Sequence, residues 1–218
     1  QHQVARQLIR GVAHEIKNPL GGIRGATQLL ARSLNDPKYS EFTDIIISEV
    51  DRLRNLADTM LGSRQLPSYQ LVNVHEPLER ARALINNQSK QKIKIIRDYD
   101  LSLPDVMADR DQLIQVMLNI SANALQAMLE NPAFFVEHQP ELILRTRIQR
   151  LVTINGVLNR SAVRIDIADN GPGVPEDILE SLFYPLVTGR ANGTGLGLSI
   201  AQNIMHQHGG MIECQSIA

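Results

Sequence analysis

The sequence predicts two folded parts of different class, an α-helical hairpin followed by an α/β two-layer sandwich. Helical periodicity dominates residues 4–61, and the polar segment 33–40 is its one strong break. After residue 62 the pattern changes, and strand-like runs alternate with amphipathic helices. Strands and helices mixed in this order favour one helical layer over one mixed sheet.

The predicted hairpin joins a helix over about 4–32 to a helix over about 41–61. Apolar residues of the second helix are spaced 4, 4, 3, 4 and 3 residues apart from Phe42 to Met60, close to a coiled-coil seam. A single hairpin cannot cover both apolar stripes, and a second copy would complete a four-helix bundle. We therefore expect a homodimer; the alternative is that the hairpin packs against the rest of its own chain.

His14 is the candidate reactive residue of the first helix. On a helical wheel it points away from the apolar side that carries Ile16 and Ile23, and its own face is polar and basic. An exposed, approachable nucleophile is one interpretation, and a merely solvated surface histidine is the other. Pro19 removes one helical N–H group, which predicts a kink or a division into two helices.

Composition excludes several classes of function. The 218 residues carry 22 basic and 23 acidic side chains, so no global field attracts nucleic acid or an anionic membrane. No apolar run is long enough to span a bilayer or to serve as a signal peptide. Cys214 is the single cysteine, which favours a reducing, cytoplasmic setting. Aromatic residues make up 4%, too few for a base-stacking surface.

The expected domain boundaries are 1–62 for the hairpin, 63–70 for a linker rich in turn residues, and 71–218 for the sandwich. A long helix is expected from a cap at Asp109 or Asp111 to about Glu130. The other expected elements are strands near 71–75, 92–99, 141–150, 161–168 and 211–217, a helix over 77–89, a short helix after 175, and a helix ending near His208.

Two motifs of the second part carry polar groups suited to a nucleotide. In NISAN, Asn119 and Asn123 lie four residues apart and share a helix face, where neutral oxygens suit Mg²⁺. In DNGPG, a buried Asp169 at a strand end is suited to accept a hydrogen bond from an exocyclic amine, and Gly171 and Gly173 let the backbone approach a planar base. Solvent-facing asparagines and an ordinary Asn-Gly hairpin turn are the alternatives.

Two later motifs complete the series. LFYPLVTGR, residues 182–190, has an apolar anchor and a basic end, which suits a hinged lid as well as any surface loop. GTGLGLSIA, residues 193–201, places three glycines before a helix, where free N–H groups bind a triphosphate. It matches neither the P-loop nor the dinucleotide fingerprint.

Together these motifs resemble the sensor histidine kinases of two-component systems. HEIKNPL is similar to their phosphoacceptor box, NISANAL to the N box, DNGPG to the G1 box, LFYPL to the F box and GTGLGLSIA to the G2 box. The resemblance covers nearly the whole chain and extends to the nitrogen-regulation kinases of the NtrB type. It implies a dimerisation and phosphotransfer hairpin before a catalytic domain of the Bergerat type, which gyrase, Hsp90 and MutL share.

The resemblance implies autophosphorylation of His14 from ATP with Mg²⁺, then transfer to an aspartate of a response regulator of the NtrC type. Glu15 would orient or deprotonate the imidazole, and Asn18 would position water for dephosphorylating the regulator. A PII-type signalling protein is a further implied partner. The implied nucleotide site comprises Asn119, Asn123, Asp169, Gly171, Gly173, Phe183, Arg190, Gly193, Thr194, Gly195, Leu196 and Gly197, with Asn123 as the metal ligand.

The sequence departs from the family pattern in three places. Gln126 and Ala127 stand where many relatives have a basic residue after the N box, so Arg190 becomes the candidate phosphate contact. The family also has a PAS domain before the hairpin and, after residue 218, final strands with a late glycine box; we expect the C-terminal end of this domain to be incomplete. Two other readings are a Bergerat ATPase without histidine phosphorylation and a nucleotide-sensing dimeric scaffold.

Overall fold

The computed structural model describes residues 2–34, 36–61, 67–90, 92–136, 138–185, 187–188 and 195–216; within them, the side chains of 2–15, 37, 52 and 54–61 are not described. The chain divides into two compact units, residues 1–66 and 67–218. The first unit is all α-helical, and the second combines helices with sheets. The predicted fold class is therefore confirmed.

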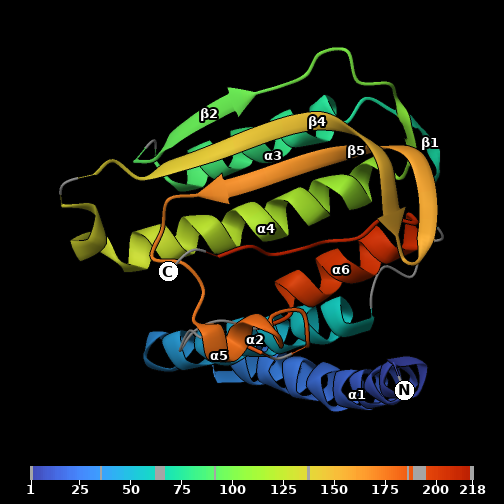
Figure 1. Cartoon of the computed structure of the whole chain (residues 1–218). Coiled ribbons are helices and arrows are strands. Elements are labelled where there is room, and N and C mark those ends of the chain that lie inside the picture. Colours follow the sequence, from blue (N-terminus) through green and yellow to red (C-terminus); the bar gives the residue numbers. More distant parts are fainter. Residues whose placement is uncertain are drawn as a thin grey trace. The chain divides into compact units, whose positions relative to one another are not determined.

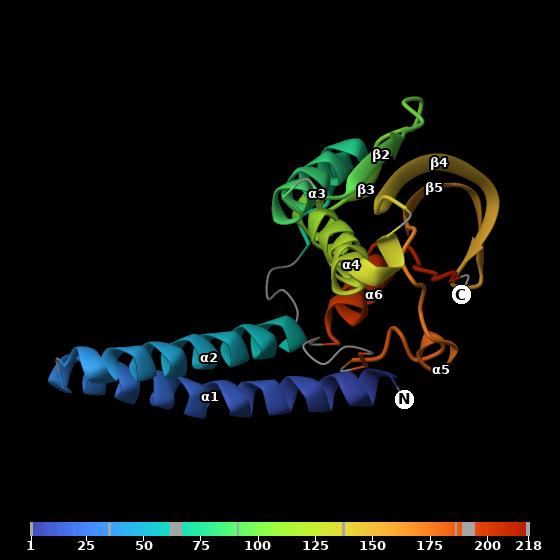
Figure 2. The same ribbon diagram turned by 90° about the vertical axis from the view of Figure 1, so that its left-hand side faces the viewer.

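The first unit is a hairpin of two long helices, α1 (His2–Leu34) and α2 (Pro37–Leu61), which lie side by side in Figure 2. α1 passes through Pro19 as one continuous helix, so the alternative of two helices is wrong. α2 begins four residues before the expected start at 41, because Asp36 caps it. The Lys38 N–H donates to Oδ1 of Asp36 at 2.9 Å.

Among its described side chains, the hairpin buries only a narrow line. Leu20 and Thr27 from α1 are buried, as are Thr43 and Val50 from α2. One bidentate ion pair, between Arg24 and Asp51 with distances of 2.8 and 3.3 Å, also joins the helices. Most of the predicted apolar stripe stays outside this contact. Large apolar side chains exposed on the hairpin include Ile16, Ile23, Leu29, Leu30, Phe42, Ile45, Ile46 and Leu53.

The second unit is built on a three-stranded mixed sheet of β2 (Lys94–Asp98), β4 (Glu141–Ile154) and β5 (Val157–Asp169). β2 pairs parallel to β4, and β4 pairs antiparallel to β5. Helices cover one face of this sheet (Figure 1). The remaining elements are β1 (Gln70–Val72) and β3 (Val106–Ala108), which pair with each other, and α3 (His75–Gln88), α4 (Arg110–Glu130), η1 (Pro132–Phe135), α5 (Glu176–Leu179) and α6 (Gly197–Gln207).

The core of this unit lies between the helices and the inner face of the sheet. Leu78 and Ile85 of α3 and Met128 of α4 are almost completely buried against Leu142 and Leu144 of β4. Side chains alternate between the two faces of a strand, so residues 145 and 147 of β4 point outward. The core is aliphatic, as the low aromatic content predicts.

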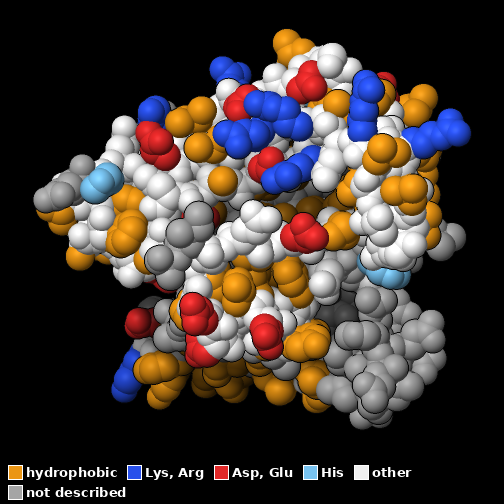
Figure 3. All heavy atoms as spheres, in the orientation of Figure 1, with side chains coloured by type: hydrophobic (Ala, Val, Ile, Leu, Met, Phe, Trp, Pro, Cys, Tyr) orange, Lys and Arg blue, Asp and Glu red, His pale blue; other side chains and the backbone are white. Residues whose placement is uncertain are grey.

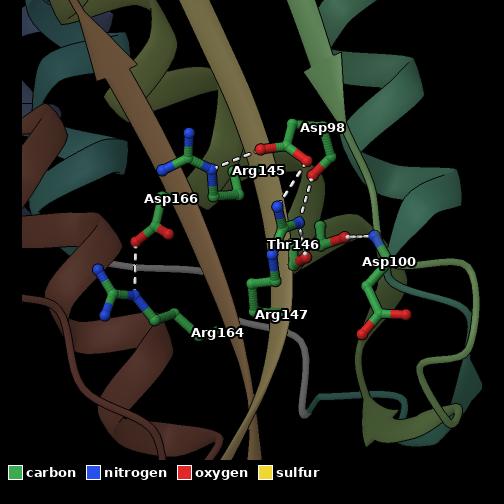
Figure 4. Close-up of polar contacts among 7 residues, drawn as sticks. All are labelled: Asp98, Asp100, Arg145, Thr146, Arg147, Arg164 and Asp166. Atoms are coloured by element: carbon green, nitrogen blue, oxygen red, sulfur yellow. Dashed lines mark hydrogen bonds and ion pairs between the residues drawn. The ribbon is translucent and has the colours of Figure 1, made fainter.

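The outer face of the sheet carries charged pairs instead of a covering layer. The carboxylate of Asp98 accepts from Arg145 at 2.7 Å and from Arg147 at 2.6 Å, and Arg164 pairs with Asp166 at 2.7 Å (Figure 4). Figure 3 shows blue and red side chains gathered over this region. A solvated outer face explains why these strands alternate in polarity.

Two expected elements differ from the structure. β4 and β5 extend past the expected strands to meet at a two-residue turn, Asn155–Gly156, with φ of 51° and 79°. Both values are positive, as a type I′ turn requires. The expected strand at 211–217 is wrong for its described part, since residues 211–216 join no strand ladder despite their alternating pattern. An alternating sequence forms a strand only where a neighbouring strand is within hydrogen-bonding reach.

Candidate functional site

α4 is the element around which the candidate site is arranged. Asp109 caps its first turn, because Oδ1 accepts the Gln112 N–H at 3.0 Å. The helix buries its apolar side in the core, whereas Asn119 and Asn123 are half-buried. These two asparagines lie four residues apart and therefore share one face of the helix.

The glycine-rich segment meets this face at the start of α6. Nδ2 of Asn119 donates to the carbonyl oxygen of Gly197 at 3.0 Å. A Cβ added at Gly197 would lie 3.8 Å from Cβ of Asn119 and 4.0 Å from Nδ2 of Asn123, so all three residues converge. The structure thus brings together the two motifs that the sequence singled out separately.

The N-terminus of α6 has no side-chain cap from its N-cap residue, Leu196. Gly195 has φ of 64°, a left-handed conformation that favours glycine, and Leu196 after it is buried. An apolar leucine cannot accept a hydrogen bond from the first N–H groups of α6, which in other helices bond to a capping side chain. Backbone N–H groups in this position suit a phosphate group.

Asp169 stands at the carboxyl end of β5. It shares the inner face of the sheet with Ile167 and Ile165, which pack against the core. Its side chain is exposed, so the expectation of a buried carboxylate is wrong: the strand ends here and the chain turns away. Oδ1 accepts the Gly171 N–H at 2.9 Å, and Oδ2 has no hydrogen-bond partner within the described part of the chain.

The two glycines of the turn after Asp169 serve different purposes, since a side chain at Gly171 would displace the Asp169 carboxylate and Gly173 has a left-handed backbone. A Cβ at Gly171 would approach Oδ1 of Asp169 to 2.6 Å and Cγ of Met128 to 3.7 Å. Gly173 has φ of 80°. The alternative of a hairpin turn is wrong, because the Asn170 side chain instead accepts the Glu141 N–H at 2.8 Å and donates to the backbone across the sheet end.

The two ends of this site lie along the same helix. Asn119 contacts the glycine-rich segment, and Met128, nine residues later on α4, lies beside Gly171. Nine residues correspond to about 13 Å of helix. Such an arrangement suits an elongated ligand with an anionic end near Gly197 and a hydrogen-bonding base near Asp169. Within the described residues, no group of three or more His, Cys, Asp or Glu side chains is arranged to hold a metal ion.

Cys214 lies close enough to Asp169 for the carboxylate charge to affect the pKa of the thiol. Burial of the thiol, followed by the negative charge of Asp169, raises the pKa of Cys214. Its segment is held beside the same turn, since Oγ of Ser216 accepts the Val174 N–H at 2.8 Å. The thiol therefore stays protonated at neutral pH and borders the base end of the site as a neutral group.

The lid motif is described only in part. Phe183 is half-buried in the turn that follows α5, where the Tyr184 N–H donates to the Ser181 carbonyl at 2.8 Å. Arg190, Gly193 and Thr194 lie outside the described residues. Their contacts with phosphate therefore stay predictions.

The reactive histidine belongs to the other unit. His14 and Glu15 lie within α1, although their side chains are outside the description. Asn18, one turn later, is exposed. Neither unit has, among its described helices, one that is both long and apolar enough to cross a bilayer.

Sequence reasoning missed one polar cluster at the end of α6 away from Gly197, formed by Ser68, Tyr69, Asp109 and His208. The sequence identifies Asp109 only as a helix cap. Ser68 and Asp109 are 41 residues apart, Asp109 and His208 are 99 apart, and Tyr69 bonds to Gln207, 138 residues away, so no local pattern predicts these contacts. An Asp before a long helix was the one available signal.

Comparison with known families agrees with this arrangement. The profile of the family described as histidine kinase-, DNA gyrase B-, and HSP90-like ATPase matches residues 108–218, half of the chain. The profile of the His Kinase A (phospho-acceptor) domain matches residues 4–67. Each profile covers one of the two groups of motifs.

Two relatives align with nearly the whole of this chain. The sensory histidine kinase/phosphatase NtrB of Escherichia coli O157:H7 is 50% identical over 217 residues, covering 99% of this chain and 60% of the relative. The protein of the same description from Rhizobium meliloti (strain 1021) is 40% identical over 225 residues, covering 99% of this chain and 57% of the relative. The chain thus spans about 60% of the length of these relatives.

Two solved structures share the fold. Full-length ShkA in complex with AMPPNP aligns with a TM-score of 0.63 and 25% identity, over 92% of this chain and 41% of that one. Histidine kinase ThkA in complex with response regulator protein TrrA aligns with a TM-score of 0.55 and 24% identity, over 94% of this chain and 55% of that chain. The chain therefore belongs to the histidine kinase-, DNA gyrase B-, and HSP90-like ATPase family, and over nearly its whole length it is similar to sensory histidine kinase/phosphatase NtrB proteins.

Proposed function

We propose that this chain phosphorylates itself on His14 from ATP and passes the phosphoryl group to an aspartate of a response regulator. The proposal includes phosphatase activity on that regulator, a regulator of the NtrC type and a role in nitrogen regulation. The observation that carries it is the Asn119–Gly197 hydrogen bond, which joins the N box to the glycine-rich loop in a chain that also holds HEIKNPL on a helix. The names of the relatives support the finer assignments.

ATP is the proposed ligand of the second unit. Oδ2 of Asp169, which has no hydrogen-bond partner among the described residues, would accept the adenine amine, and the glycines at 171 and 173 would admit the base. The triphosphate would meet the glycine-rich loop, residues 193–197, with Arg190 and Phe183 on the lid. Asn119 would hold the loop, and Asn123 would supply a neutral oxygen to Mg²⁺, a donor type that this cation accepts.

His14 is the proposed acceptor of the phosphoryl group. Phosphoryl transfer requires in-line positioning and neutralisation of charge more than covalent work from the protein. An imidazole with an ordinary pKa of about 6.5 is largely neutral near pH 7 and so has a lone pair for attack. Glu15 would orient the ring, and Asn18 would orient water toward a phosphoaspartate.

The partners and the domain plan follow from the same proposal. A second copy would cover the exposed apolar stripe of the hairpin and give a homodimer. Residues 1–62 would serve dimerisation and phosphotransfer, 63–70 would connect, and 71–218 would bind ATP. A PII-type protein is proposed as a further partner, and the cytoplasm as the location.

Labelling with γ-labelled ATP and Mg²⁺ tests the proposal. We expect label on the protein that is acid-labile and alkali-stable, and that is absent from His14→Gln but present in the control His138→Gln. Release of inorganic phosphate without labelled protein would favour the ATPase alternative. Nucleotide binding with neither label nor phosphate release would favour the scaffold.

A further inference from the structure

We propose that His208 is a positioning residue for the nucleotide site, acting from the opposite end of α6. The proposal rests on the proposed function of that site and concerns how the helix is held. His208 follows the last residue of α6, whereas Gly197, which contacts Asn119, is the first. The helix is thus fixed at both ends, and only one end belongs to the motifs.

The hydrogen bonds of His208 define which ring nitrogen carries the proton. Nδ1 lies 2.8 Å from the carbonyl oxygen of Ile204, which can only accept. Nε2 lies 3.0 Å from the Asp109 N–H, which can only donate. Both contacts are satisfied only by a neutral ring with its proton on Nδ1. The imidazole therefore joins the C-terminus of α6 to the residue that caps α4.

Asp109 extends this junction to the beginning of the second unit. Its Oδ1 accepts the Gln112 N–H, and its Oδ2 accepts the Ser68 N–H at 2.8 Å. Burial acts to raise the pKa of Asp109, but backbone hydrogen bonds, those from Gln112 and Ser68 first among them, act in the opposite direction, and the pKa is lowered overall. An ionised carboxylate thus holds the segment through which the chain arrives from the hairpin.

Tyr69 makes the second contact of this segment with α6. Its hydroxyl donates to the Gln207 carbonyl at 2.9 Å, and its ring meets the His208 ring edge-on, with centroids 5.2 Å apart. His208 is therefore the shared partner of Asp109 and Tyr69. We name these four residues, Ser68, Tyr69, Asp109 and His208, the clamp.

The clamp acts on the site because α4 and α6 pack along their lengths. Val116 of α4 and Ala201 and Ile204 of α6 are buried together between the clamp and the Asn119–Gly197 bond. A tilt of α6 at its clamped end would move Gly197 against the two asparagines. A displacement of Ser68 and Tyr69 would therefore change the geometry at the phosphate end of the site. Nucleotide bound there would in turn restrict the motion of the clamp residues.

The test measures ADP binding to the full chain in the presence of Mg²⁺ by calorimetry. We expect His208→Ala to weaken ADP binding about five- to tenfold, because the substitution removes both hydrogen bonds of the ring and with them the link between α6 and Asp109. His208→Gln should restore most of the affinity, because its amide oxygen reaches the Asp109 N–H. His206→Ala, an exposed histidine on the same helix, is the matched control and should bind as the wild type does.

Hydrogen exchange on the same proteins separates positioning from simple loss of structure. In the wild type, ADP should slow exchange of the Ser68 and Asp109 amides, and in His208→Ala this protection should disappear. An unchanged affinity in a folded His208→Ala whose clamp amides exchange faster would overturn the proposal. If the wild type itself binds no ADP, the proposed function fails, and this inference fails with it.

Tyr69→Phe gives a second, milder test that does not threaten folding, since it keeps the ring against His208. It removes one hydroxyl bond, and we expect ADP binding to weaken about twofold. Affinity equal to that of the wild type in Tyr69→Phe, together with an unchanged affinity in His208→Ala, would also count against the clamp.

Discussion

The two units differ in how much of their apolar surface is buried. The second unit closes a core in which Leu78, Ile85, Leu142 and Leu144 are almost completely buried. The hairpin leaves most of its described apolar stripe in solvent, including Phe42 at 60% exposure. Since burial of one such side chain is worth about 1.5–3 kcal/mol, the hairpin lacks the stabilisation that the second unit already has.

This difference indicates which unit can hold its functional residues in place by itself. A closed core gives the second unit a fixed geometry at Asn119 and Gly197 without a partner. The hairpin presents Asn18 on a helix whose described apolar side chains are mostly exposed, which is the surface that we propose a second copy covers. Substitutions should therefore separate assembly, nucleotide chemistry and regulator chemistry between the two units.

The largest effect is expected from Phe42→Glu, which tests assembly. A carboxylate in the dimer contact should weaken the proposed homodimer about a hundredfold, because an apolar contact is lost and a charge is desolvated. Sedimentation equilibrium measures this change. Leu101→Glu is the matched control, since Leu101 is 84% exposed but belongs to the second unit. A dimer as tight as the wild type would show that the stripe is not the interface.

Asn123→Ala should reduce autophosphorylation at least about tenfold, because a ligand that organises charge in the transition state is lost. The dimer should persist, since Asn123 lies in the other unit. Initial rates of labelling measure the effect, and the exposed Asn87→Ala on α3 is the control. Activity above about a tenth of the wild type would show that Asn123 is not the proposed Mg²⁺ ligand.

Much of the fold was predictable because its signals are local. The hairpin, α4 and its Asp109 cap follow from periodicity and capping. The β4–β5 turn was also predictable, since Asn155–Gly156 is a strong hairpin signal between alternating residues, but the strands were expected to stop short of it. β3, three residues long, has too few residues for a period to be detected.

The site was predictable as motifs but not as geometry. Spacing placed Asn119 beside Asn123, whereas the contact with Gly197 joins residues 78 positions apart. The exposure of Asp169 depends on where β5 ends, and the His208 junction depends on how α6 lies on α4. Such tertiary placements are set by packing, which a single sequence pattern does not encode.

Asn18→Ala should separate two activities of the hairpin. We expect stimulated dephosphorylation of the regulator to fall about tenfold, because the water is no longer oriented, while autophosphorylation and transfer stay within about twofold. All three rates and the melting temperature are measured on one preparation. Parallel losses, with a lower melting temperature, would show that Asn18 only supports the helix before Pro19.

Asp169→Ala should weaken ATP binding about fivefold through loss of one hydrogen bond to the base. Preference for ATP over GTP should fall by a similar factor. Calorimetry with both nucleotides measures this preference, and Asp166→Ala, on the opposite face of the same strand, is the control. Undiminished discrimination between the nucleotides would exclude Asp169 as the base-reading group.

The smallest effect is expected on the outer face of the sheet, and it depends on pH. Hydrogen bonds from Arg147, then from Arg145, lower the pKa of Asp98 (Figure 4). A lowered pKa means that the ion pairs stabilise the fold above the ordinary aspartate value of about 3.9, and that this stabilisation is lost as the pH falls through the lower, folded-state value. Exposed ion pairs contribute little to the free energy of unfolding. The substitution Asp98→Asn should therefore lower the melting temperature at pH 7 by no more than about 2 °C.

The pH dependence distinguishes this contribution from a general effect of mutation. The gap in melting temperature between wild type and Asp98→Asn should narrow as the pH is lowered below about 4, because the wild-type carboxylate then becomes protonated. Asp105→Asn is the control, since Asp105 is exposed and has no ion pair with any described residue. A gap that stays constant between pH 7 and pH 3 would mean that the charge of Asp98 does not stabilise the second unit. The sheet would then rely on its inner face alone, and the contrast with the hairpin would rest entirely on buried apolar area.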